Sequence, residues 1–128
     1  MSSELIQRLK EREERMVEIR RYLHAHPELS FKEVETPKYI AEFYKDKDCE
    51  VETNVGENGL KVTIDSGKPG KTIAIRADFD ALPIEEATGL PFASENPGVM
   101  HACGHDAHTA YMPVSYTHLR AHETGRNL

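Results

Sequence analysis

Apolar residues recur at helical spacing near the start of the chain. Steps of three and four residues, or multiples of them, predict one amphipathic helix over residues 3–24. The apolar positions are Leu5, Leu9, Met16, Ile19 and Leu23. Ser3 can cap this helix, and Pro27 ends it because proline disfavours helical geometry in the residue before it. A second helix is predicted to begin near Thr36, which Pro37 follows, and to stop at residues 46–48.

The pattern then changes to alternation. Residues 51–55 and 60–64 each place apolar side chains on one face of a strand. Asn58 and Gly59, between them, are a strong turn signal. A second turn is predicted at residues 65–70. Residues 72–77 have too few polar side chains for a solvent-facing strand, so they predict a buried one.

An irregular loop is expected over residues 83–100, which hold three prolines and two glycines. Polar residues follow directly after the predicted buried strand. Two helices followed by three strands predict an α/β fold. Polar groups beyond the carboxyl end of a strand are where open α/β sheets bind ligands.

Composition narrows the class of protein. The chain has 128 residues, with 16 basic and 22 acidic ones, a net charge of −6. Such a balance disfavours nucleic acid and anionic membranes as partners. No apolar run approaches the roughly 20 residues of a membrane span. The charged N-terminus lacks the apolar core of a secretory signal. Two cysteines are too few for a disulfide framework, which predicts a reducing, cytoplasmic setting.

The strongest chemical signal is the segment 100–109, MHACGHDAHT. Thiolate, imidazole and carboxylate are the ligands that borderline-soft divalent metals prefer. In an extended segment Cys103 and His105 point the same way, so both could reach one ion. Asp106 can begin a helix. A surface loop with a structural cysteine and solvated histidines explains the same residues, and two ligands do not complete a zinc site.

A second group of candidate residues is Arg76–Leu82 (RADFDAL), in which Asp78 and Asp80 share one face if the strand continues through them. Paired carboxylates can bind a cation or orient a ligand histidine. They are equally common in turns at strand ends.

Two further histidine groups carry less weight. For residues 23–30 (LHAHPELS) the favoured interpretation is a helix end, with His24 near the negative end of the helix dipole. His118 and His122 are four apart, as in helical metal sites. Position 119, however, is Leu rather than the Glu that a metalloprotease helix requires there.

Taken together, residues 20–30, 76–84 and 98–109 resemble the amidohydrolase branch of the zinc aminoacylase–carboxypeptidase family. The resemblance implies a catalytic α/β domain, with a mixed sheet flanked by helices, and an inserted lid domain. It also implies a site for two divalent ions, zinc or manganese. The implied reaction is hydrolysis of the amide bond of N-acyl amino acids. Alternatives are a dipeptidase or carboxypeptidase of the same family, or a non-catalytic fragment that binds metal weakly.

By motif match, Cys103 and His105 correspond to metal ligands, and Asp80 corresponds to the carboxylate that supports the site. Asp78 falls where related peptidases carry a ligand histidine, so its role is less defined. The implied partner is a small N-acyl amino acid or short peptide, with neither nucleic acid nor membrane involved. Some members of the family form homodimers through the lid.

The resemblance is incomplete. The family's general-base glutamate, its remaining ligands and its lid have no counterpart in the sequence, so we expect the chain alone to be inactive. Residues 1–112 are interpreted as the N-terminal part of the catalytic domain. Residues 113–128 (PVSYTHLRAHETGRNL) resemble a translated sequencing adapter and are interpreted as a non-native tail. Pro113 is expected to interrupt the helix, and the tail is expected to pack poorly.

Overall fold

A computed structural model describes residues 3–126, apart from the side chains of residues 117, 118 and 120–126, which lie outside the description. The mixed α/β class is confirmed. In the part described, the helices are α1 (Ser3–Lys10), α2 (Glu13–Ala25), α3 (Glu35–Tyr44) and α4 (His105–Arg126), and the strands are β1 (Glu50–Val55) and β2 (Gly59–Thr63).

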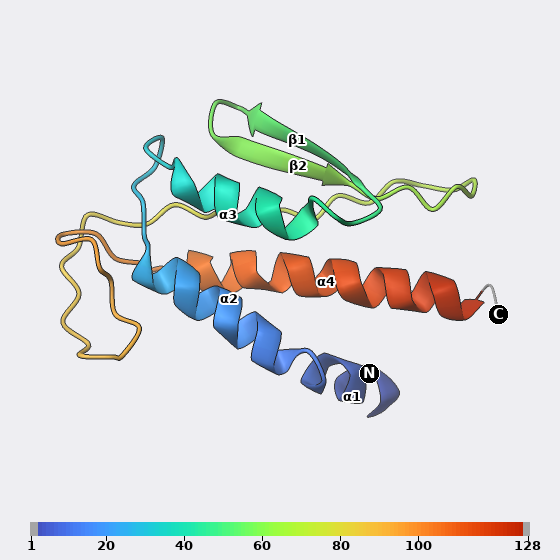
Figure 1. Cartoon of the computed structure of the whole chain (residues 1–128), viewed down its shortest axis with the longest axis horizontal. Helices are drawn as coiled ribbons and strands as arrows, with labels where there is room; N and C mark the ends of the chain where they lie inside the picture. Colours follow the sequence, from blue (N-terminus) through green and yellow to red (C-terminus); the bar gives the residue numbers. More distant parts are fainter. Residues whose placement is uncertain (1–2, 127–128) are drawn as a thin grey trace.

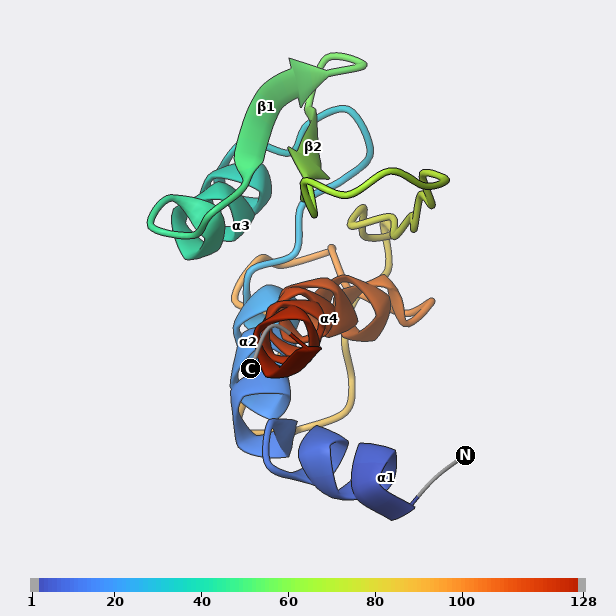
Figure 2. The ribbon, with the colours of Figure 1, turned by 90° about the vertical axis from the view of Figure 1, so that its right-hand side faces the viewer.

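The elements form two stacked pairs. Helix α2 packs against α4, and α3 packs against the β1–β2 hairpin. Figures 1 and 2 both show α3 and the hairpin on one side of α4, with α2 on the other. Helix α4 therefore lies at the centre of the molecule. None of the described helices, α4 included, is both long and apolar enough to cross a membrane.

Two apolar clusters meet on α4. Ile19 and Leu23 of α2 pack with Ala110 of α4, which is fully buried. On the other side, Ile40 and Tyr44 of α3 pack with Tyr116 and with apolar residues of the hairpin; those hairpin residues are Val51, Leu60 and Val62. Helix α4 thus joins the two halves of the core.

The N-terminal segment forms two helices rather than the predicted single one. Helix α1 ends at Lys10, and α2 begins at Glu13. The residues between Leu9 and Met16 are all charged, so no apolar contact holds the helix straight there. Helix α1 buries none of its residues. The predicted stop at Pro27 is confirmed, since α2 ends at Ala25.

The predicted hairpin is confirmed, with its turn shifted by two residues. Strands β1 and β2 pair antiparallel, with a bulge between Thr53 and Val55. The left-handed turn residues are Gly56 and Glu57, at φ 58° and 82°, rather than Asn58 and Gly59. Gly59 begins β2, where a Cβ would lie 2.7 Å from the carbonyl oxygen of Val55. Only glycine fits that position without a shift of the backbone.

The predicted buried strand at residues 72–77 is wrong. This segment belongs to no strand, and Ile73 and Ile75 are 85% and 62% exposed. A strand buried on both faces needs neighbouring strands, and the described part of the chain pairs none with it. The segment runs back from the hairpin toward the end of α2 (Figure 1), where Ala81 forms a parallel bridge with Leu29.

The expectation that Pro113 interrupts the helix is also wrong. Helix α4 continues through Pro113, which is fully buried. Proline removes one backbone hydrogen bond, but Val114 and Tyr116 are buried beyond it, at 7% and 6% exposed. The expected poor packing is therefore wrong for these two residues. The interpretation of residues 113–128 as non-native stays a prediction, and the side chains of His118 and His122 lie outside the described residues.

A carboxylate from outside the helix caps α3. The predicted start near Thr36 is confirmed within one residue: α3 begins at Glu35, and Val34 before it makes no side-chain cap. Instead, Glu28 accepts hydrogen bonds from the backbone N–H groups of Val34, Glu35 and Thr36, at 2.9, 3.1 and 2.7 Å. These are N–H groups that an α-helix leaves without internal partners. A carboxylate there also suits the positive end of the helix dipole.

Replacing Tyr116 tests whether the residues after Pro113 belong to the core. Its ring meets Tyr44 edge-on at 5.7 Å. We expect Tyr116→Ala to lower the free energy of unfolding by about 3–5 kcal/mol in urea titrations, because it empties a packed aromatic site. Tyr111→Ala, on the same helix but 48% exposed, should stay within about 0.5 kcal/mol of the wild type. Equal, small effects would mean that residue 116 does not pack.

The Glu28 cap predicts a specific pH dependence. Burial raises the pKa of this carboxyl, but hydrogen bonds from Thr36, Val34 and Glu35 outweigh it, so the pKa lies below its ordinary value of 4.5. The carboxylate therefore stabilises the fold above about pH 4.5, and that contribution is lost as the pH falls through the folded-state pKa. Between pH 5 and 3, as an approximate window, wild-type stability should fall more steeply than that of Glu28→Gln. If the free energy of unfolding falls equally with pH in both proteins, the Glu28 carboxylate does not stabilise α3 as a cap.

Candidate metal centre

The first candidate ligand, His105, is held by the candidate supporting carboxylate, Asp80. The His105 Nδ1 atom lies 3.0 Å from Asp80 Oδ1 and 3.0 Å from the Asp80 carbonyl oxygen. Both oxygens are acceptors, so Nδ1 carries a hydrogen, and in the neutral ring Nε2 keeps its lone pair. A carboxylate that fixes the tautomer in this way is the usual outer partner of a metal-binding histidine. The two side chains are 23% and 29% exposed, within reach of solvent.

Backbone hydrogen bonds of the two residues after Asp80 hold it in place. The N–H of Ala81 donates to the Glu28 carbonyl oxygen at 2.8 Å, just after α2. Leu82 forms an antiparallel bridge with Met100. The bridge closes the base of the loop at residues 83–100, which is irregular as predicted. Asp80 thus sits where the segment from the hairpin crosses the end of α2.

The other candidates differ in their surroundings. Cys103 is exposed and forms no disulfide. It is separated from His105 by Gly104, whose φ of 81° turns the chain into α4. The Asp78 side chain is 46% exposed and pairs with Arg76 at 2.8 Å. Its carbonyl oxygen accepts a hydrogen bond from Thr109 of α4. The structure therefore brings Asp80, but not the Asp78 carboxylate, against His105.

The donors present fit part of a metal site. Cys103 offers a thiolate and His105 an imidazole nitrogen, both suited to borderline-soft divalent ions. Within the described residues no group of three or more His, Cys, Asp or Glu side chains could hold an ion. His101, in the same loop, is buried, and its Nδ1 has no hydrogen-bond partner among the described residues. Burial holds the pKa of His101 below 6.5.

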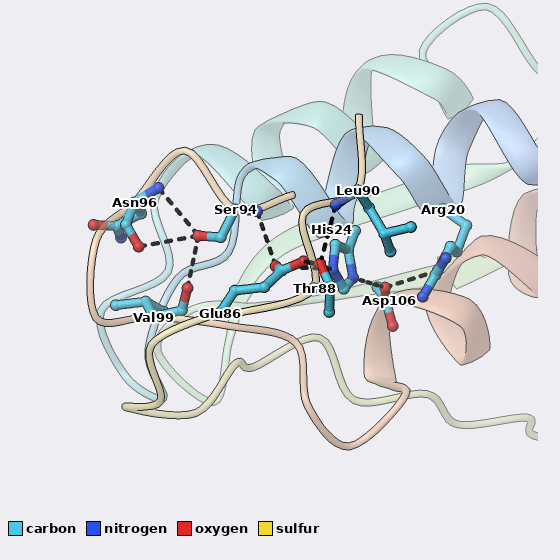
Figure 3. A network of polar contacts seen from close by, with 9 residues as sticks. All are labelled: Arg20, His24, Glu86, Thr88, Leu90, Ser94, Asn96, Val99 and Asp106. Atoms are coloured by element: carbon cyan, nitrogen blue, oxygen red, sulfur yellow. Dashed lines mark hydrogen bonds and ion pairs between the residues drawn. The ribbon is translucent and has the colours of Figure 1, made fainter. Parts of the chain in front are cut away.

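Asp106, the residue after His105, belongs to a buried polar cluster that the sequence patterns do not predict (Figure 3). The His24 ring lies between two carboxylates. Its Nδ1 is 2.7 Å from Asp106 Oδ2, and its Nε2 is 3.0 Å from Glu86 Oε1. The Arg20 Nε donates to Asp106 Oδ2 at 2.9 Å. The side chains of His24, Glu86 and Asp106 are at most 3% exposed, whereas that of Arg20 is 36% exposed, so three members of this cluster lie in the interior and Arg20 lies at its edge.

Glu86 has further partners in its own loop. Ser94 N–H donates to its Oε1 at 2.9 Å, and the Thr88 hydroxyl donates to its Oε2. Burial raises the pKa of Glu86, but these hydrogen bonds and the contact with His24 lower it below 4.5 in sum. Glu86 is therefore held as a carboxylate.

The favoured sequence interpretation of His24, a helix end near the dipole, misses its main contacts. Its partners lie 62 and 82 residues further along the chain. No local spacing could reveal such pairs. The one signal in the sequence is that Asp106 directly follows the candidate ligand His105.

Comparison with known proteins identifies the family. Residues 74–127, which include the Asp80–His105 pair, match the family model described as Peptidase family M20/M25/M40. Over 98 residues, 77% of the chain, the sequence is 49% identical to an N-acetyl-L-cysteine deacetylase of Bacillus subtilis. The chain belongs to the M20 family.

Solved structures of the M20 type have the same fold. A protein of methicillin resistant Staphylococcus aureus, provisionally described as an aminohydrolase, superposes on 97% of the chain with a TM-score of 0.90 and 72% identity. The YXEP protein of Bacillus subtilis, described as a dinuclear metal binding peptidase of the M20 family, covers 89% with a TM-score of 0.82 and 45% identity. The chain spans 24% of the deacetylase and 33% and 32% of these two structures.

The Asp80–His105 contact predicts unequal roles for the two aspartates. We expect Asp80→Asn to weaken divalent-metal binding by about 10–100-fold, because the ring loses its orienting carboxylate. Asp78→Asn should have a smaller effect, since that carboxylate faces Arg76 instead. Isothermal titration of zinc or manganese into each variant measures the difference. Equal losses would contradict the assignment of Asp80 as the supporting carboxylate.

Proposed function

We infer that the protein is a metal-dependent hydrolase of the M20 family that cleaves the amide bond of N-acyl amino acids. The observation that carries this proposal is the His105–Asp80 pair, inside the stretch that matches the family. Cys103 lies two residues before His105. The deacetylase that is 49% identical to the chain acts, by its name, on such a substrate.

Each site residue has a role in this proposal. The Cys103 thiolate and the His105 Nε2 atom would hold an ion, and Asp80 would keep His105 in the right tautomer. When bound, a pair of zinc or manganese ions supplies Lewis-acid chemistry, by polarising the amide carbonyl and lowering the pKa of an attacking water. The exposure of Cys103 leaves its thiol open to the ion. Neither Cys49 nor Cys103 forms a disulfide, which supports a cytoplasmic location.

The 128-residue chain is expected to be inactive by itself. Cys103 and His105 are two donors, whereas a catalytic zinc site has three protein ligands and a water. General-base catalysis alone contributes about 10²–10⁴-fold. Assays on N-acetyl amino acids, with and without chelator, should therefore give no turnover for the chain and chelator-sensitive turnover for the Bacillus subtilis deacetylase. Chelator-insensitive turnover by either protein would contradict metal dependence.

A peptidase is the second candidate function. The observation in its favour is that the YXEP protein, which shares 45% identity, is described as a peptidase. Both reactions break an amide bond, so the same residues serve either. Parallel assays of N-acetyl amino acids and of dipeptides, in a longer chain that includes this segment, would separate them.

The role of Cys103 can be tested directly. A serine hydroxyl stays protonated near neutral pH and is a poor zinc ligand compared with a thiolate. We expect Cys103→Ser to lower metal affinity at least tenfold. Mutating a residue that only orients a ligand already lowers metal affinity by ~10–100-fold, and Cys103 is proposed to be a ligand itself.

The matched control is Cys49→Ser. Cys49 packs against the hydrophobic cluster of Ile40, Tyr44 and Tyr116. Replacing it should therefore cost some stability and leave metal binding intact. Zinc titration followed by elemental analysis measures both variants. Unchanged stoichiometry and affinity in Cys103→Ser would contradict the ligand assignment.

A further inference from the structure

We propose that His24 is a positioning residue for the metal centre. Held between Glu86 and Asp106, it fixes the first turn of α4 and so keeps His105 against Asp80. This inference rests on the proposed function for the metal, but the geometry of His105 can be measured without any metal.

The first step concerns the contacts of His24. Both ring nitrogens of His24 face carboxylate oxygens, at 2.7 and 3.0 Å. These two contacts fix the plane and the direction of the ring. The Arg20 Nε holds Asp106 from a third direction, at 2.9 Å from its Oδ2. Removing one partner leaves a buried charge without compensation, so the ring is strongly constrained where it lies.

The second step links this cluster to α4. Asp106 is the second residue of α4 and directly follows His105. Successive residues of a helix point in directions about 100° apart. The same turn therefore sends Asp106 toward α2 and His105 toward Asp80. Because Asp106 is fixed by His24, the rotation of this turn about the helix axis is fixed as well.

The third step concerns the opposite partner, Asp80. Its neighbour Ala81 donates to the Glu28 carbonyl oxygen at 2.8 Å. The segment 24–29 thus holds α4 through the side chain of His24 and holds Asp80 through the backbone of Glu28. It also accepts hydrogen bonds from the loop at Glu95 and Asn96. Both halves of the His105–Asp80 contact depend on one short stretch of chain.

The decisive experiment reads the tautomer of His105 in the metal-free 128-residue chain. Long-range ¹H–¹⁵N NMR of histidine rings distinguishes a ring protonated at Nδ1 from a mixture of tautomers. We expect a single Nδ1–H form for His105 in the wild type. In His24→Gln, whose amide can donate to only one of the two carboxylates at this distance, we expect a mixture. The same variant should bind cobalt at least tenfold more weakly, as for loss of an outer-shell partner.

Two controls separate positioning from a general loss of stability. His26→Gln changes a histidine two residues further on, whose side chain is 43% exposed and contacts Glu95 instead of the cluster. It should keep the His105 tautomer and the cobalt affinity. Tyr116→Ala destabilises the core from a distant site, and under conditions where it is folded its His105 tautomer should also match the wild type.

Each outcome decides the proposal. A folded His24→Gln with an unchanged His105 tautomer would overturn it, whether or not cobalt binds. If His24→Gln does not fold, the His105 tautomer is measured in Glu86→Gln instead. This variant keeps the shape of Glu86 and alters one contact of the His24 ring. An unchanged tautomer there would also overturn the proposal. A lost tautomer together with a wild type that binds no cobalt would support positioning and contradict the proposed metal function.

Discussion

The His24 ring meets the carboxylates of Glu86 and Asp106 in the interior where α2 ends and α4 begins, with Arg20 at the edge of the cluster. The contacts of His24 with Glu86 and Asp106 join three segments that are far apart in the sequence. Buried charges without partners are costly, so the three segments can adopt this arrangement only together. Arg20 is partly exposed to solvent, and its guanidinium lies over the ring of Phe92, in the loop at residues 83–100. The path of the loop at residues 83–100 follows from these contacts.

The candidate metal centre depends on the same constraint. His105 lies in the first turn of α4, whose orientation Asp106 fixes. Asp80 precedes Ala81, whose backbone N–H donates to the Glu28 carbonyl oxygen. Glu28 also caps α3 through its carboxylate. One short segment after α2 therefore connects the cap of a helix, the base of a loop and the position of a candidate ligand. A change in that segment reaches the site without touching a metal ligand.

Packing explains why α4 tolerates a proline. The lost backbone hydrogen bond at Pro113 is local, whereas Val114 and Tyr116 bury their side chains in the cluster with α3. Helical stability in proteins comes mainly from such tertiary contacts rather than from the propensity of single residues. The opposite case is residues 72–77, where strand propensity is high but no described strand pairs with them.

The sequence by itself determined the features that depend on local pattern. Amphipathic spacing located α2 and α3, alternation located β1 and β2, and the motif around Cys103 and His105 indicated the family and its chemistry. The family resemblance pointed to Asp80 as the supporting carboxylate, but local pattern did not separate Asp78 from Asp80, and only the tertiary structure places the Asp80 carboxylate against His105. Only the tertiary structure gave the contacts of His24 and Glu28. Their partners lie on other segments of the chain, and a contact between distant segments leaves no periodic signal in either one.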